Sequence, residues 1–296
     1  MQELPPEVPE LNYGSYEFRA TPEYYRDEIA KSRRPHIIFA IEVTAHSKHL
    51  VYYLSKNLAN VIKNYWPTDH HYPEFKLSPL VGFVTYNSRV TIYDITKRII
   101  AYVIPDMASA TECVPTTKFL VDPHENLDEI EKFLASLPEI CSEDLEREDQ
   151  TVLGPAIEAA LATCLYDTSN YFPNQKPNQS PNQKLIPTGK IYVLHSSLPS
   201  SGDENTPGRL GAKRNLDDMR RQLGTETENK ILKPDDRYYA DLARRCIYDY
   251  GTGVELYLFP NNPKVYLNIA TVGDLACLTG TGVVNKYHIS ALNNFI

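Results

Sequence analysis

Short apolar runs alternate along this chain with longer stretches in which apolar residues recur at helical spacing. Residues 37–43 are almost continuously apolar, which is typical of a parallel strand covered on both faces. In residues 47–65 apolar positions recur every three or four residues behind a potential N-cap, Ser47, which predicts a helix. Residues 80–86 and 90–95 are β-rich runs around a turn dipeptide and predict a hairpin.

The next segments predict two successive helices that cover the sheet. Residues 99–121 show no regular pattern and contain prolines, so we expect them to be irregular. An apolar stripe over residues 127–137 predicts a helix that Pro138 terminates. Thr151 opens a second helix whose inward face carries Ile157, Leu161 and either Cys164 or Leu165. Residues 173–184 repeat P-N-Q at a period of four and contain nothing to bury. We therefore expect a disordered insertion around residues 168–188.

The last third of the chain continues the alternation of strands and helices. Gly189 begins another buried strand, and residues 254–259 and 283–287 predict two more. Asp235 or Asp236 is expected to cap a helix that ends just before Gly251, and residues 271–279 predict a short helix. The alternation predicts a doubly wound α/β fold: a mostly parallel sheet with helices on both faces and one antiparallel edge strand.

This pattern also predicts the domain organisation. Residues 1–35 form an N-terminal extension, with a short edge strand expected over residues 16–19, and residues 36–296 form one large domain. No apolar run approaches the roughly 20 residues of a membrane-spanning helix, so we expect a soluble protein whose membrane contacts are peripheral. Five cysteines, an odd number without a C-x-x-C pair, indicate reduced thiols in a cytosolic protein.

The charge balance narrows the choice of partner. A net charge of −8 argues against nucleic acid, because phosphate binding requires a surplus of Lys and Arg on the contacting surface. The strongest basic feature is a loop that could receive acidic peptide signals or anionic lipid headgroups. A solvated loop without a partner is an equally good interpretation. Its basic residues are Arg209, Lys213, Arg214, Arg220 and Arg221.

The exit of the first strand carries the most informative chemistry. In von Willebrand A-type domains a buried strand ends in D-x-S-x-S, whose oxygens hold Mg²⁺. The corresponding positions here are Glu42, Thr44 and His46. Glutamate moves the carboxylate by one methylene, and histidine offers a nitrogen that suits zinc or copper better than magnesium. We therefore expect a degenerate site that holds no metal.

Three further motifs lack residues that their known functions require. His46 and His49 lack further ligands for a transition metal. Thr188-Gly189-Lys190 lacks the earlier glycine and the final Ser or Thr of a phosphate loop. His195-Ser196-Ser197 follows a strand, but no G-x-S-x-G elbow presents a serine and no acid partner is evident. A metal-dependent A-type module that uses Glu42, Thr44 and an acidic residue of its ligand remains the alternative to a scaffold, and an α/β hydrolase or nucleotide enzyme is a weaker third.

Several motifs in order resemble one family. They are G-S-Y-E-F-R-A-T-P-E-Y-Y at residues 14–25, I-I-F-A-I-E-V at 37–43, V-G-F-V-T-Y-N at 81–87, L-G-P-A-I-E-A-A at 153–160, G-K-I-Y-V-L-H-S-S-L-P at 189–199, P-G-R-L at 207–210, V-E-L-Y-L-F-P-N at 254–261 and I-A-T at 269–271. Together they resemble the trunk domain of the Sec twenty-four family, the cargo-selecting subunit of the COPII inner coat. V-G-F-V-T-Y-N and H-S-S-L-P are most similar to its vertebrate C and D branch.

The resemblance implies a von Willebrand A-like fold without a working metal site, and no catalysis. It implies pairing with the Sec twenty-three subunit, capture of cytosolic export signals of membrane cargo, and a cytoplasmic location at endoplasmic reticulum exit sites and on COPII vesicles. No cofactor is implied within this chain, since zinc belongs to a neighbouring domain of a complete subunit. The chain is accordingly expected to be an excised domain or a reduced paralogue. It departs from the family in the P-N-Q tract and in Glu42, where aspartate is usual.

Overall fold

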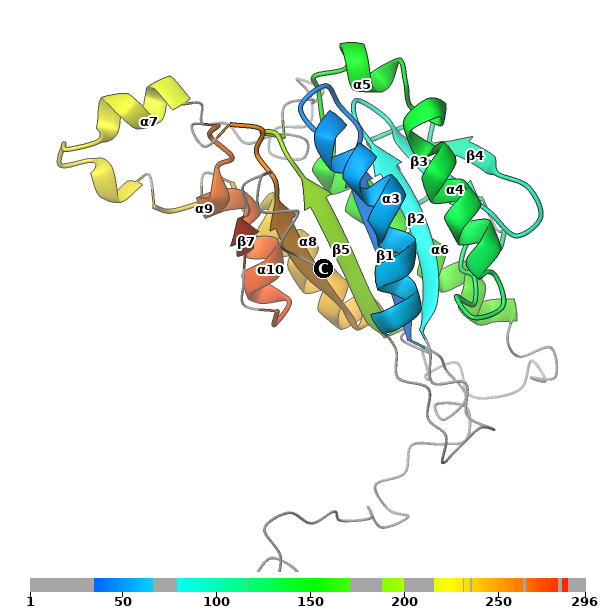
Figure 1. Ribbon diagram of the computed structural model, residues 1–296. Helices are drawn as coiled ribbons and strands as arrows, with labels where there is room; N and C mark the ends of the chain where they lie inside the picture. The colour runs from blue at the N-terminus through cyan, green and yellow to red at the C-terminus, as the bar shows by residue number, and fades with distance from the viewer. Residues whose placement is uncertain are drawn as a thin grey trace, which may run out of the picture. The chain divides into compact units, whose positions relative to one another are not determined.

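A single mixed sheet organises the computed structural model (Figure 1). Seven strands lie in the order β4-β3-β2-β1-β5-β6-β7 within the described residues. β2, β1, β5, β6 and β7 are parallel neighbours, whereas β3 runs antiparallel to both β2 and β4. The described residues are 35–65, 79–115, 117–170, 188–199, 216–230, 232–234, 236–262, 265–281 and 284–286.

The strands alternate with helices along most of the chain, as the hydrophobic pattern predicts. The strands are β1 (His36–Glu42), β2 (Leu80–Tyr86), β3 (Val90–Asp94), β4 (Ile100–Val103), β5 (Gly189–His195), β6 (Thr252–Leu258) and β7 (Val284–Lys286). The helices are α3 (Lys48–Tyr65), α4 (Leu127–Ile140), α5 (Asp144–Arg147), α6 (Leu153–Asn170), α7 (Leu216–Gln222), α8 (Tyr238–Tyr250), α9 (Ile269–Val272) and α10 (Asp274–Leu278), with a 3₁₀ turn at Glu228–Lys230.

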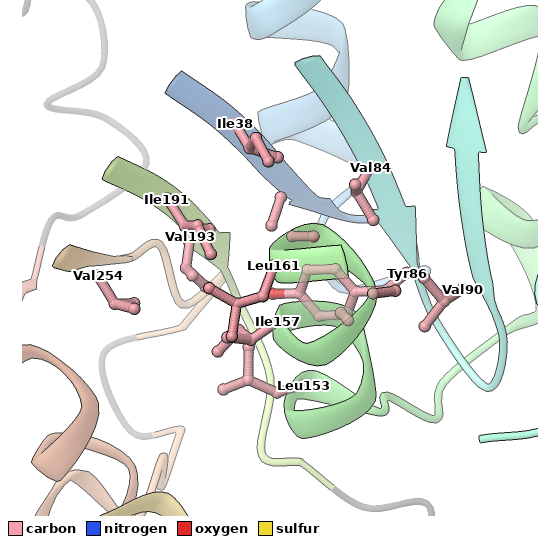
Figure 2. Packing of buried hydrophobic residues seen from close by; sticks show 14 of the residues in the cluster. Ile38, Val84, Tyr86, Val90, Leu153, Ile157, Leu161, Ile191, Val193 and Val254 are labelled. Atoms are coloured by element: carbon pink, nitrogen blue, oxygen red, sulfur yellow. The ribbon is translucent and has the colours of Figure 1, made fainter. Parts of the chain in front are cut away.

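Helices cover both faces of the sheet, so the core has two halves. On one face α3 and α4 pack against alternate side chains of the central strands, including Phe39 and Phe83. On the other face α6, α8 and α10 pack against the intervening side chains. Figure 2 shows this second half, where Ile38, Val84 and Ile191 of the strands lie with side chains of α6. Because β1 and β2 are buried on both faces, they read as continuous apolar runs in the sequence.

The predicted fold class is confirmed, including the antiparallel edge. That edge differs in one respect from the prediction, because residues 99–121 were expected to be irregular and instead contribute β4. β4 has only four residues and its burial alternates between half-buried and exposed. Such a short, weakly buried strand gives little periodic signal, and pairing with β3 fixes it.

Two helix boundaries also differ from the prediction. Pro138 was expected to end its helix, but α4 continues to Ile140. Pro138 lies two residues before the end of α4, and assigned helix ends commonly differ by one or two residues. The short helix expected over residues 271–279 is divided at Gly273 into α9 and α10.

Other expectations lie outside the described residues, namely the edge strand at residues 16–19 and the P-N-Q tract. Of the insertion expected around residues 168–188, residues 168–170 belong instead to α6. The inward face of the second helix is confirmed at Ile157, Leu161 and Cys164. The side chain of Leu165 is not among those described. At the start of α8, Asp236 accepts the backbone N–H of Tyr238 at 2.8 Å, while Gly251 ends the helix with a left-handed φ of 55°.

Gly154 sets how closely α6 and α8 approach, which yields a first prediction. A Cβ at this position would lie 2.4 Å from the Tyr238 ring. We expect Gly154→Ala to destabilise the domain by about 1–3 kcal/mol, because inserting a methyl group into packed structure forces its neighbours to move. Urea denaturation measures the effect. Gly253→Ala is the matched control, since its Cβ would meet Thr281 at an ordinary 3.4 Å; equal losses in both variants would contradict the interpretation.

Candidate functional site

The carboxyl ends of three adjacent strands bring polar side chains together in the interior. Glu42 is the last residue of β1, Tyr86 of β2 and His195 of β5. Glu42 and Tyr86 are paired in the strand register. All three side chains are buried. Parallel strands end at one edge of a sheet, and in open α/β folds this edge is the usual ligand site.

Glu42 lies at the centre of a dense set of hydrogen-bond donors. Its Oε1 accepts the hydroxyls of Thr44 and Ser197, each at 2.7 Å. Its Oε2 accepts the backbone N–H of Ser196 at 2.6 Å and that of Ser197 at 3.2 Å. Nδ1 of His195 lies 2.7 Å from the same oxygen. The strand exit is therefore closed by the loop that follows β5.

This arrangement leaves Glu42 without acceptor capacity for an ion. A carboxylate offers about four lone-pair positions, and five donors already surround this one. Two of the donors are backbone N–H groups, which cannot reverse their direction as hydroxyls can. Within the described part of the chain, no group of three or more His, Cys, Asp or Glu residues could hold a metal ion. The Glu42 environment thus fits an internal hydrogen-bond acceptor better than a metal ligand.

The donors also determine the ionisation of Glu42. Burial alone would raise the pKa of its carboxyl group, but His195, Ser196 and Ser197 outweigh burial and lower the pKa to about 2. The short contact to the ionised carboxylate indicates that Nδ1 of His195 carries a proton and donates it. The Tyr86 hydroxyl, 3.0 Å from the same nitrogen, then donates to the carbonyl oxygen of Leu194 at 3.4 Å.

The three residues of the degenerate metal motif do not converge on one point in the structure. Thr44 turns its hydroxyl onto Glu42, so two former ligand positions bond to each other. His46 is half-buried and its Nδ1 lies 3.4 Å from the side-chain nitrogen of Asn261, away from this pair. Ser47, the potential N-cap, directs its hydroxyl at the carbonyl of Glu42 at 2.8 Å and accepts the N–H of Thr44 at 2.9 Å. The loop is thereby tied to the strand it leaves.

The loops around this site are joined to one another. Ala45 donates its N–H to the carbonyl of Glu148 at 2.8 Å. Ser88, in the β2–β3 turn, donates its hydroxyl to the carboxylate of Glu148 at 2.6 Å. Val152 donates its N–H to the carbonyl of Asn87 at 2.8 Å. Segments distant in sequence thus hold the strand exits in place.

The acid partner that the His195-Ser196-Ser197 motif lacked in the sequence is Glu42, about 150 residues earlier. The resulting group nevertheless differs from a hydrolase triad. Ser196 and His195 are fully buried. The Ser196 hydroxyl and Nε2 of His195 have no hydrogen-bond partner in the part of the chain that the structure describes, so they do not bond to each other. A serine in this arrangement is neither activated nor accessible.

The basic residues proposed from the sequence are described only in part. Arg209, Lys213 and Arg214 lie outside the described residues. Arg220 and Arg221 lie in the last turn of α7 and are exposed. Among the described residues, Arg220 has one ion pair, at 3.8 Å to Asp217, and both side chains are largely in solvent. An exposed pair of this kind contributes little, so it leaves the Arg220 guanidinium able to reach an anion.

The closed carboxylate yields a second prediction. We expect Mg²⁺ or Mn²⁺ at millimolar concentration to leave the melting temperature unchanged, because an ion that bound the native state would stabilise it. Differential scanning fluorimetry with and without a chelator measures the effect. A rise in melting temperature that Glu42→Gln abolishes would instead support the metal-dependent A-type module.

The described helices include none with the length and hydropathy required to cross a membrane.

Comparison with known proteins identifies the family to which this chain is similar. Residues 32–171 and 179–293 match the family described as the Sec23/Sec24 trunk domain. The human protein transport protein Sec24C is 31% identical over 290 residues, which cover 94% of this chain and 23% of that protein. Human Sec24D is 29% identical over 304 residues, which cover 98% of this chain and 24% of that protein.

The fold agrees with the sequence match. The crystal structure of the human COPII-coat protein Sec24c superimposes with a TM-score of 0.69 and 30% identity over 95% of this chain and 33% of that one. The chain spans about a quarter of the length of these curated relatives. They are the C and D branches that the motifs at residues 81–87 and 195–199 predicted. By sequence and by fold, this chain belongs to the Sec23/Sec24 trunk domain family.

Proposed function

We propose that this chain is a non-enzymatic scaffold and cargo-adaptor domain of the COPII inner coat. The observation that carries the proposal is the match to the trunk domain family along almost the whole chain. In this role it pairs with the Sec23 subunit and helps to select cytosolic export signals of membrane cargo. It acts in the cytoplasm, peripherally on membranes at endoplasmic reticulum exit sites and on COPII vesicles.

The buried side chains at the carboxyl ends of the strands support a role without catalysis or cofactor. Glu42, His195 and Ser196 would be the reactive groups of an enzyme at this edge, and each is fully buried. The carboxylate is engaged by donors of its own chain. An adaptor requires only that the strand exits be stable, because recognition takes place on its outer surface.

Exposed charge on α7 supports a contact with acidic signals or anionic lipid headgroups. Arg220 and Arg221 lie in solvent at the end of this helix. Arginine forms bidentate hydrogen bonds with carboxylates and phosphates, which suits both ligands.

Pairing with the Sec23 subunit is the decisive test and the third prediction. We expect the chain, mixed at micromolar concentration with Sec23, to elute from size exclusion as one complex with a 1:1 mass by light scattering. Reversing the exposed charges of Arg220 and Arg221 to Glu should leave this complex intact and weaken binding to acidic peptides or anionic vesicles. Elution of both proteins as separate species would contradict the proposal.

A further inference from the structure

The β4 strand leaves one edge of the sheet open within the described residues. Figure 1 shows β4 beyond β3, at the margin of the sheet. Ile104 donates its N–H to the carbonyl of Val90 in β3 at 2.8 Å. Counting back from Ile104 by two residues at a time, Tyr102 and Ile100 also pair with β3. Backbone groups alternate in direction along a strand. The N–H and C=O groups of Ala101 and Val103 therefore point away from the sheet.

The side chains along this edge are apolar and exposed. Ile99 is 40% exposed and Val103 is 52% exposed, and Ala101 between them is also exposed. Tyr102, by contrast, packs its ring edge-on against Phe119, with ring centroids 5.4 Å apart. The alternate residues 99, 101 and 103 thus form an uncovered row, whereas Tyr102 anchors the strand to the core.

The usual protections of an edge strand flank this row without interrupting it. Natural edges are commonly blocked by charged residues, proline or a covering segment, because open backbone groups recruit other strands. Here Lys97 and Arg98 precede the row and Pro105 follows it. Between them, residues 99–103 contain neither a charge nor a proline. The open stretch is long enough to pair with one short strand.

The sequence of this stretch is close to symmetric about Ala101, and we propose that it pairs with the same strand of a second copy. In an antiparallel register centred on Ala101, each Ile99 lies opposite the Val103 of the other copy, and the two Ala101 residues face each other. Ala101 and Val103 have outward backbone groups, so the central Ala101 pair can exchange two hydrogen bonds. Ile99 directly precedes β4, and the two outer pairs require the strand to extend by this one residue. The β-branched pairs add favourable cross-strand contacts.

The charges at the ends of the row agree with this register. Arg98 of one copy lies diagonally opposite Asp106 of the other, and the symmetry repeats the contact. Both residues are exposed, and diagonal neighbours lie within reach of long side chains. No like charges face each other between residues 97 and 105 in this arrangement. A second copy is therefore complementary to the edge in hydrogen bonding, shape and charge.

The contact is small, so the dimer is weak and forms only at high concentration. A pairing of five residues buries less than the roughly 1,200 Å² typical of stable complexes. We expect association in the range of about 100 μM to 1 mM, equivalent to roughly 4–5.5 kcal/mol. It needs no coat subunit, so its outcome is independent of the pairing with Sec23 tested at micromolar concentration.

A charge swap at the symmetry position tests the proposal. Sedimentation velocity from about 10 μM to 1 mM should show the wild-type chain passing from monomer to dimer. Ala101→Lys and Ala101→Glu should each abolish the dimer, because two like charges would face each other. An equimolar mixture of the two variants should restore it. A wild-type chain that stays monomeric, single variants that still dimerise, or a mixture that stays monomeric would each overturn the proposal.

A backbone variant separates the edge contact from folding. Val103→Pro removes only an outward N–H, and proline is tolerated at edge positions of this kind. It should lose the dimer while keeping the melting temperature within a few degrees of the wild-type value. Val103→Thr keeps the N–H and the β-branched shape and should retain the dimer. If the proline variant dimerises like the wild type, β4 is not the interface.

Discussion

Replacing Glu42 by alanine is expected to destabilise the domain by about 3–5 kcal/mol, the scale measured when one partner of a buried charged network is removed. The substitution leaves the N–H groups of Ser196 and Ser197 and Nδ1 of His195 without their acceptor. These groups are buried, so each retains the cost of desolvation without a hydrogen bond. Chemical denaturation monitored by circular dichroism measures the loss.

The choice of substituent tests the geometry. Glutamine can place its amide nitrogen at the Oε1 position, where the Thr44 and Ser197 hydroxyls can rotate and accept. Glu42→Gln should therefore cost less than Glu42→Ala. Glu139→Gln is the control, because Glu139 is exposed on α4 and surface substitutions usually change stability by about 0.5 kcal/mol or less. If Glu42→Ala and Glu139→Gln lowered the free energy of unfolding by the same amount, the buried hydrogen-bond network would be contradicted.

Acidification is expected to destabilise the fold in two separable stages. Burial lowers the pKa of His36 from 6.5 to about 4, and the donors around Glu42 outweigh its burial to lower the pKa of that carboxyl from 4.5 to about 2. Both folded-state values lie below the unfolded ones, so the unfolded chain binds more protons in each window. Stability is therefore lost as the pH falls, first from about 6.5 to 4 through His36 and then from about 4.5 to 2 through Glu42. Each stage amounts to about 3 kcal/mol.

The two stages can be assigned with one variant each. His36→Gln keeps a side chain that can hydrogen-bond to Thr252, which lies 3.1 Å from Nε2 of His36, but it does not titrate. It should flatten the stability curve between pH 6.5 and 4 and leave the lower stage. Glu42→Gln should do the reverse. Urea unfolding at a series of pH values measures both, and a wild-type curve that is flat above pH 4 would refute the assignment of the upper stage to His36.

Local periodicity predicted much of the fold but not its irregular parts. β1 and α3 follow from an apolar run and a helical repeat that need no knowledge of distant residues. β4 was missed because four residues at an edge carry almost no periodic signal. α4 extends two residues past Pro138, which is within the margin of one or two residues by which helix ends are defined.

The sequence singled out some residues of the candidate site but neither grouped them nor gave their arrangement. Glu42, Thr44 and His195 stood out by residue type, and the sequence indicated that the magnesium motif was altered. The donors that replace the ion could not be foreseen, because two are backbone groups of Ser196 and Ser197. Tyr86 gave no signal either, since a tyrosine that ends a strand is ordinary. Only the parallel register brings these positions together.

The closed exit of β1 also bears on how such a domain can be regulated. An adhesion module that holds its ligand through a bound ion responds to chelators and to changes in divalent cation concentration. Here internal dipoles and hydroxyls engage the carboxylate, so we expect no thermodynamic linkage to Mg²⁺ or Ca²⁺ through Glu42. On that expectation, a calcium transient leaves its affinity for the proposed coat partners unchanged. In the proposed coat role, control would then act through local concentration and the simultaneous engagement of several weak contacts.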